Sequence, residues 1–138
     1  MERSDQKNKP ADNIAERNSS RVLLVEDDYF LRNLLLHKLN QEKLSVETAV
    51  NGKEALEKAK NLLPKVIILD LVLPDIDGFD VLKSLKDQEM TKKIPVLVVS
   101  NLGQKDEIEK CLNLGANDYL IKANFTPKEI VEKVKNYL

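Results

Sequence analysis

The chain has 138 residues, 42% of them hydrophobic and 33% charged, which is the length and balance of one soluble globular domain. Its net charge of −1 argues against the basic face that nucleic acid binding needs and against electrostatic attraction to a membrane surface. The single cysteine and single histidine, Cys111 and His37, exclude an intrachain disulfide and a zinc cluster.

The first 20 residues are polar and contain Pro10. Such a segment buries too little apolar surface to offset the entropy of ordering it, so we expect a flexible tail with a short helical turn around residues 11–17. It lacks the apolar core of a signal peptide, and no run in the chain approaches the roughly 18 apolar residues that span a bilayer. We therefore expect a cytoplasmic protein whose folded domain covers residues 21–138.

From residue 21 onward, short apolar runs alternate with segments of helical periodicity. The predicted strands are residues 22–25, 45–50, 66–69, 96–99 and 118–121. The predicted helices are residues 29–40, 51–63, 79–85, 104–114 and 126–138. Asn51 and Thr126 are each followed three residues later by glutamate, which indicates capped helix starts.

Two of these helices carry explicit packing predictions. In the fourth helix, Ile108, Cys111 and Leu112 are expected on one side. In the last helix, the residues expected to face the core are Ile130, Val131, Val134 and Leu138.

Five strand–helix repeats indicate an α/β domain, with a parallel sheet covered by helices on both faces. Ligands of such sheets bind at the carboxyl ends of the strands. The polar residues at these ends are Glu26, Asp27 and Asp28 after the first strand, Asp70 after the third, Ser100 after the fourth and Lys122 after the fifth.

Clustered carboxylates repel one another unless a cation joins them, and Mg²⁺ prefers oxygen ligands of this kind. Lys122 and Ser100 add a positive charge and a hydroxyl donor for phosphoryl oxygens. The set is suited to the transfer of a phosphoryl group onto a carboxylate, and Asp70 is the candidate acceptor.

Four stretches, in this order, resemble the receiver domain of two-component response regulators. They are VLLVEDD (22–28), VIILDLVLPDIDGFDVL (66–82), IPVLVVSNLG (94–103) and GANDYLIKA (115–123). The resemblance implies a doubly wound, flavodoxin-like (βα)5 fold with strand order 2-1-3-4-5. It also implies a phosphoacceptor that is not itself classed as an enzyme, beyond slow autodephosphorylation.

The resemblance assigns roles to individual positions. Asp70 matches the phosphoacceptor, and Lys122 the lysine beside the phosphoryl group. Asp27 and Asp70 match carboxylates that bind Mg²⁺ directly, and Glu26 matches an acid that acts through water. The backbone carbonyl of Val72 matches a further Mg²⁺ ligand. The implied phosphodonor is a histidine kinase or a phosphotransfer protein.

Ser100 matches the switch hydroxyl and Tyr119 the aromatic ring that moves inward on activation. The implied output is a contact with a downstream protein on the face formed by residues 104–114, 118–121 and 126–138. Because the chain ends at Leu138, we expect output through a partner protein or through self-association, and the protein is expected to be a monomer or a phosphorylation-dependent dimer. The candidate surface of the last helix comprises Lys128, Glu132, Lys133 and Lys135.

Four positions depart from the family pattern. Ala123 replaces the usual cis-proline, so the peptide bond before it is either trans or strained. Asn101 stands where a small residue is usual and either crowds or hydrogen-bonds the phosphoryl group. Val72 and Leu102 are apolar where family members place the hydrolytic water, so we expect slow loss of the phosphate.

Other functions remain open on the sequence. A degenerate receiver that binds partners without phosphorylation is the main alternative. A haloacid dehalogenase-type phosphatase is disfavoured because Val72 stands in the position of its acid/base, and a nucleotide-binding module because no glycine-rich phosphate loop is present. Asp28 alone is equally well explained as a helix cap.

Overall fold

The computed structural model describes residues 21–138, so the predicted tail and its helical turn lie outside the described residues. Five parallel strands form one sheet in the order β2-β1-β3-β4-β5, as expected. The strands are β1 (Arg21–Val25), β2 (Ser45–Ala49), β3 (Val66–Leu69), β4 (Val96–Ser100) and β5 (Asp118–Ile121).

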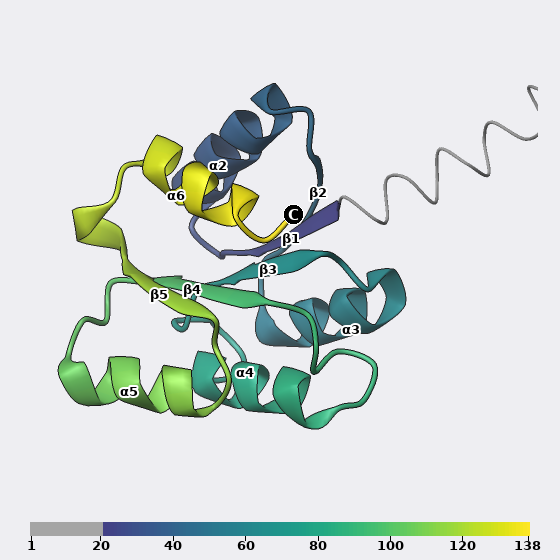
Figure 1. The fold of residues 1–138 in the computed structure, drawn as a ribbon, viewed down its shortest axis with the longest axis vertical. Coiled ribbons are helices and arrows are strands. Elements are labelled where there is room, and N and C mark those ends of the chain that lie inside the picture. Colours follow the sequence, from purple (N-terminus) through teal and green to yellow (C-terminus); the bar gives the residue numbers. More distant parts are fainter. Residues whose placement is uncertain (1–20) are drawn as a thin grey trace, which may run out of the picture.

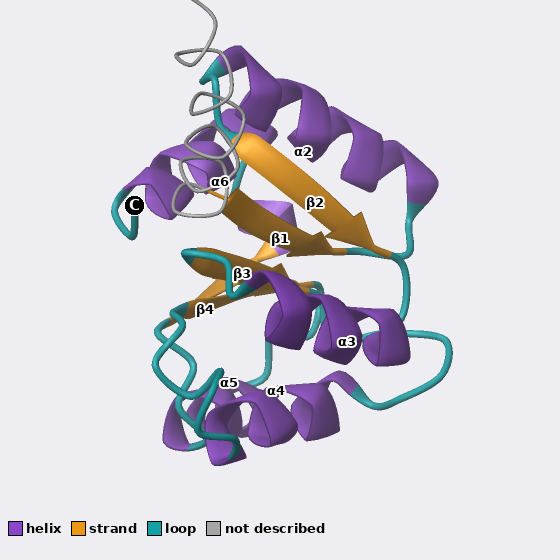
Figure 2. Cartoon of the chain, turned by 90° about the vertical axis from the view of Figure 1, so that its right-hand side faces the viewer, coloured by secondary structure: helices purple, strands orange, loops and turns teal. Residues whose placement is uncertain are grey.

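Helices cover both faces of this sheet (Figures 1 and 2). α2 (Tyr29–Gln41) and α6 (Pro127–Lys135) pack on one face. The other face is covered by α3 (Gly52–Leu62), α4 (Gly78–Asp87) and α5 (Lys105–Asn113). Among residues 21–138, no helix is long and apolar enough to cross a membrane.

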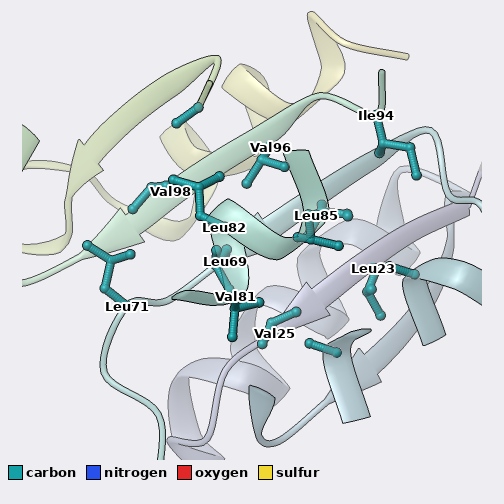
Figure 3. Packing of buried hydrophobic residues seen from close by; sticks show 14 of the residues in the cluster. Leu23, Val25, Leu69, Leu71, Val81, Leu82, Leu85, Ile94, Val96 and Val98 are labelled. Carbon is teal, nitrogen blue, oxygen red and sulfur yellow. The ribbon is translucent and has the colours of Figure 1, made fainter. Parts of the chain in front are cut away.

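The central strands β1, β3 and β4 are almost entirely apolar because both of their faces are buried, whereas the edge strand β2 is more polar and only partly buried. In β1, Val22 and Leu24 face α2 and α6, whereas Leu23 and Val25 face the other helical layer. Figure 3 shows this second core, in which side chains of β1, β3 and β4 pack against α4.

Side-chain caps fix where several helices begin. Asn51 accepts a hydrogen bond from Glu54 N, and Thr126 forms a capping box with Glu129, as predicted. Asp77 caps α4. Each cap satisfies a backbone N–H of the first helical turn that has no partner within the helix.

Two packing predictions were wrong. Leu112 is 46% exposed, because it is about 100° around α5 from Cys111, which is fully buried. Leu138 is 42% exposed, because α6 ends at Lys135 and its periodicity does not extend to the last residue.

The backbone between Lys122 and Ala123 is trans, since residues 21–138 contain no cis peptide bond. The short 3₁₀ helix η1 (Lys122–Asn124) follows β5 directly. Of the two expected alternatives for the bond before Ala123, trans or strained cis, the structure therefore has the trans form.

Gly78, at the start of α4, occupies a position that has no room for a side chain. Its N–H donates to Leu71 O at 2.9 Å, and a Cβ atom there would lie 2.3 Å from Leu71 Cα. We expect Gly78→Ala to lower the free energy of unfolding by roughly 1–3 kcal/mol, because backbone atoms must move. Urea denaturation measures this.

Gly103→Ala is the matched control for that variant. A Cβ atom at Gly103 meets the end of the Ile121 side chain at 3.2 Å, and this side chain can shift. Equal stability of the two variants would contradict the close approach of Gly78 to the backbone.

Candidate functional site

The ends of β1 and β3 lie side by side because the register pairs Val25 with Leu69. The next residues, Glu26 and Asp70, therefore leave the sheet together. Ladder hydrogen bonds continue through both, from Glu26 N to Ala49 O at 3.0 Å and from Asp70 N to Val25 O at 3.1 Å. These bonds fix both backbones against the neighbouring strands.

Three carboxylates meet at this edge. One oxygen each from Glu26, Asp27 and Asp70 lies within 4.8 Å of the others. Glu26 is 3% exposed and Asp70 is 4% exposed, whereas Asp27 faces solvent. Lys122 joins the two buried acids, with its Nζ 2.9 Å from Glu26 Oε1 and 2.9 Å from Asp70 Oδ2.

The charges of this cluster are only partly balanced. Burial, followed by the neighbouring charge of Asp70, raises the pKa of Glu26 to about 7. Burial also lowers the pKa of Lys122, but its hydrogen bonds to Asp70 and Glu26 outweigh that effect and the net shift is upward. One lysine facing three carboxylates leaves an all-oxygen donor set with excess negative charge, which fits a hard divalent cation.

The raised pKa of Glu26 predicts how the metal-free protein responds to pH. Folded Glu26 keeps its proton up to about pH 7, whereas the unfolded side chain loses it near pH 4.5. The folded state therefore binds more protons in this range, and stability falls as the pH rises, by about 3 kcal/mol for this group. Urea denaturation in EDTA between these pH values measures the fall.

Glu26→Gln should remove this pH dependence, because glutamine keeps the shape of the side chain without its charge. Glu57→Gln is the matched control, since Glu57 is exposed on α3 and should leave the pH dependence unchanged. A slope that persists in Glu26→Gln would contradict the prediction.

A cleft of about 200 Å³ opens above the cluster. Its lining includes the three acids, Lys122, Asp28, Val72 and Asn101. The N–H of Val72 donates to Asp70 Oδ1 at 3.2 Å, which holds the acceptor and this loop together. The cleft thus brings together the predicted acidic residues, the predicted lysine and Val72.

Ser100 and Tyr119 lie behind the cleft. Ser100 is fully buried, and its Oγ accepts a hydrogen bond from Leu102 N at 3.3 Å. The Tyr119 hydroxyl donates to the backbone carbonyl of Leu102. Burial, followed by the proximity of Cys111, raises the pKa of Tyr119 to about 12. Both predicted switch residues therefore contact the loop that follows β4.

Asp28 is explained by its local structure. Its side chain accepts from Leu31 N at 3.1 Å and caps α2, while its N–H donates to Glu26 Oε2 at 3.1 Å. The cap reading of the sequence is confirmed for this residue.

Two residues that support the site were missed by the sequence reasoning. The Arg32 guanidinium donates to the backbone carbonyls of Glu26 and Asp27 at 3.0 and 3.1 Å and holds the acidic loop. Asp75 accepts from Gly52 N at 2.7 Å and Lys53 N at 3.0 Å, and these bonds, that of Lys53 foremost, lower its pKa. The Arg32 contact could have been predicted, because this arginine lies one helical turn after the acids in the sequence. The Asp75 contact could not, because its partners lie more than 20 residues away.

The carboxyl edge of the sheet, where ligands of doubly wound α/β domains bind, thus carries buried carboxylates and a lysine. Residues 22–135 match the response regulator receiver domain, and the chain belongs to this family of two-component signalling proteins.

Similar proteins include the alkaline phosphatase synthesis transcriptional regulatory protein PhoP of Bacillus subtilis. It is 36% identical over 122 residues, which cover 87% of this chain and 49% of PhoP. The chain spans about half the length, or less, of the curated relatives it matches first.

Two solved structures extend the comparison. The chemotaxis protein CheY4 of Vibrio cholerae is 30% identical with a TM-score of 0.79, covering 87% of this chain and 99% of CheY4. The Mn²⁺-bound form of the response regulator Rcp1 is 26% identical with a TM-score of 0.74, covering 86% of this chain and 93% of Rcp1.

Proposed function

We propose that the domain accepts a phosphoryl group on Asp70 from the phosphohistidine of a histidine kinase or phosphotransfer protein. The observation that carries this proposal is the buried Asp70 carboxylate, held 2.9 Å from the Lys122 ammonium beside two further acids. The excess negative charge around this carboxylate attracts a cation, and Lys122 can stabilise the oxygens of an added phosphoryl group.

In the proposed step an oxygen of Asp70 attacks the phosphorus atom in line with its bond to the histidine nitrogen. A P–O bond forms and the P–N bond breaks. The electron pair of that bond returns to the imidazole ring, which takes up a proton. Lys122 stabilises the negative charge on the equatorial oxygens, which is the main task of a protein in phosphoryl transfer.

Glu26, Asp27 and Asp70 are the residues that would hold Mg²⁺, together with the backbone carbonyl of Val72. When bound, the ion neutralises charge on the carboxylates and on the phosphoryl oxygens. The Mn²⁺-bound form of Rcp1 supports a divalent cation in a related receiver domain.

The proposed output depends on Ser100 and Tyr119, which meet at Leu102 in the β4–α5 loop. Movement of Ser100 toward a phosphoryl group breaks its bond to Leu102 N and changes the support of the Tyr119 ring. The population then shifts between two packings of the face formed by α5, β5 and α6. A downstream protein that contacts this face, or a second copy of the domain, reads the difference.

Incubation with acetyl phosphate and Mg²⁺, followed by intact-mass measurement, tests the proposal. We expect a gain of one phosphoryl group that Asp70→Asn abolishes and that EDTA prevents. Asp87→Asn is the matched control, because Asp87 is exposed on α4, where it pairs with Lys83. No gain in the wild-type chain would favour a receiver that binds partners without phosphorylation.

A further inference from the structure

Two polar side chains, Ser100 and Asn101, lie at the end of β4, and only one of them reaches the cleft. Ser100 is fully buried, is not part of the cleft lining, and has its hydroxyl engaged by Leu102 N. Asn101 is exposed and lines the cleft. On this side of Asp70 the amide therefore meets the cleft, and the hydroxyl does not.

The other side chains that line the cleft supply few hydrogen-bond donors, which the amide of Asn101 can add. The other polar side chains of the lining are the four carboxylates at positions 26, 27, 28 and 70, and Lys122. Within the described part of the chain, Lys122 is the sole hydrogen-bond donor among these side chains, and it already contacts Glu26 and Asp70. A phosphoryl group adds three acceptor oxygens, and one lysine together with one bound cation leaves at least one of them in need of a donor.

Asn101 supplies two N–H donors without adding negative charge. Its side chain makes no hydrogen bond to another residue of the described range, 21–138, so these donors are available without breaking an existing contact. A donor on a short side chain directly after a strand has fewer rotatable bonds to order than one on a long side chain.

We propose that Asn101 binds the phosphoryl group on Asp70 through its side-chain amide. This inference rests on the proposed function and adds a ligand to it. The amide donates to a phosphoryl oxygen on the β4 side of the cleft, while Lys122 donates from the β5 side. Ser100 then has to move to contribute, whereas Asn101 does not.

Beryllofluoride, which mimics a phosphoryl group on a carboxylate, is the probe for a titration followed by NMR in Mg²⁺. We expect Asn101→Ala to weaken its apparent binding roughly tenfold, the loss typical of a hydrogen bond to a charged group. Asn101→Asp should weaken binding further, because a carboxylate repels the anion. Asn113→Ala, at an exposed position on α5, is the matched control and should leave binding unchanged.

Mg²⁺ binding without beryllofluoride separates a phosphoryl ligand from a merely structural residue. It should be the same in Asn101→Ala as in the wild type. Equal or tighter beryllofluoride binding by Asn101→Ala would overturn the inference and indicate that the side chain only crowds the cleft, leaving phosphorylation of Asp70 intact. Failure of the wild-type chain to bind beryllofluoride would instead overturn the proposed function, and this inference with it.

Discussion

Replacing Lys122 by glutamine is expected to slow phosphorylation of Asp70 by acetyl phosphate by at least about 100-fold. In enzymes of acyl and phosphoryl transfer, removing one well-placed group that stabilises transition-state charge costs this much. Among residues 21–138, Lys122 is the only cation within the cleft lining, and its Nζ lies 2.9 Å from Asp70 Oδ2. Intact-mass measurement over time gives the rate.

Lys135→Gln is the matched control, because this lysine also forms an ion pair, at 3.0 Å to Glu42, but on the exposed surface between α6 and α2. It should phosphorylate at the wild-type rate. Circular dichroism must show that Lys122→Gln is folded, since the change leaves Glu26 and Asp70 without their partner. A folded Lys122→Gln protein that reacts within about threefold of the wild-type rate would contradict the role of the lysine.

Much of the fold follows from local pattern. The apolar run at 66–69 predicted a strand buried on both faces, and β3 (Val66–Leu69) has these bounds. Asn51 and Thr126 predicted two helix starts because capping depends on nearby backbone N–H groups. Such features are local, so the sequence contains them.

Strand order was not readable from the residues themselves. A strand that is apolar on both faces has no phase that tells which neighbour it pairs with. The order came from the resemblance to receiver domains, and the observed β2-β1-β3-β4-β5 sheet confirms it. The alternation of elements alone established only a parallel sheet.

The sequence predicted only the part of the site that follows from the positions of its residues at strand ends. Its acids and lysine follow strands directly, so the sheet topology alone brings them together. Which of two adjacent residues faces the cleft depends on the twist of the backbone after β4. That placement of Ser100 behind the cleft and Asn101 in its lining required coordinates.

The structure also separates the two apolar residues that were expected to slow hydrolysis. Val72 is 57% exposed and lines the cleft, whereas Leu102 packs against the core beside Tyr119. Of these two residues, Val72 is therefore the one placed to affect a water molecule that approaches the phosphoryl group.

We expect phosphorylated Asp70 to persist for minutes or longer, because Val72 has no polar atom in its side chain to orient the attacking water. Val72→Gln should shorten this lifetime by about 10- to 100-fold, since an amide can position the water for attack. The decay is measured by intact mass after the phosphodonor is removed.

Met90→Gln is the matched control, because Met90 is similarly exposed, at 55%, but lies in the loop before β4, away from the cleft lining. Its acyl phosphate should decay at the wild-type rate, which excludes a general effect of adding a polar surface group. Decay of the wild-type phosphate within seconds would contradict the expectation. An unchanged lifetime in Val72→Gln would place the control of hydrolysis elsewhere in the cleft.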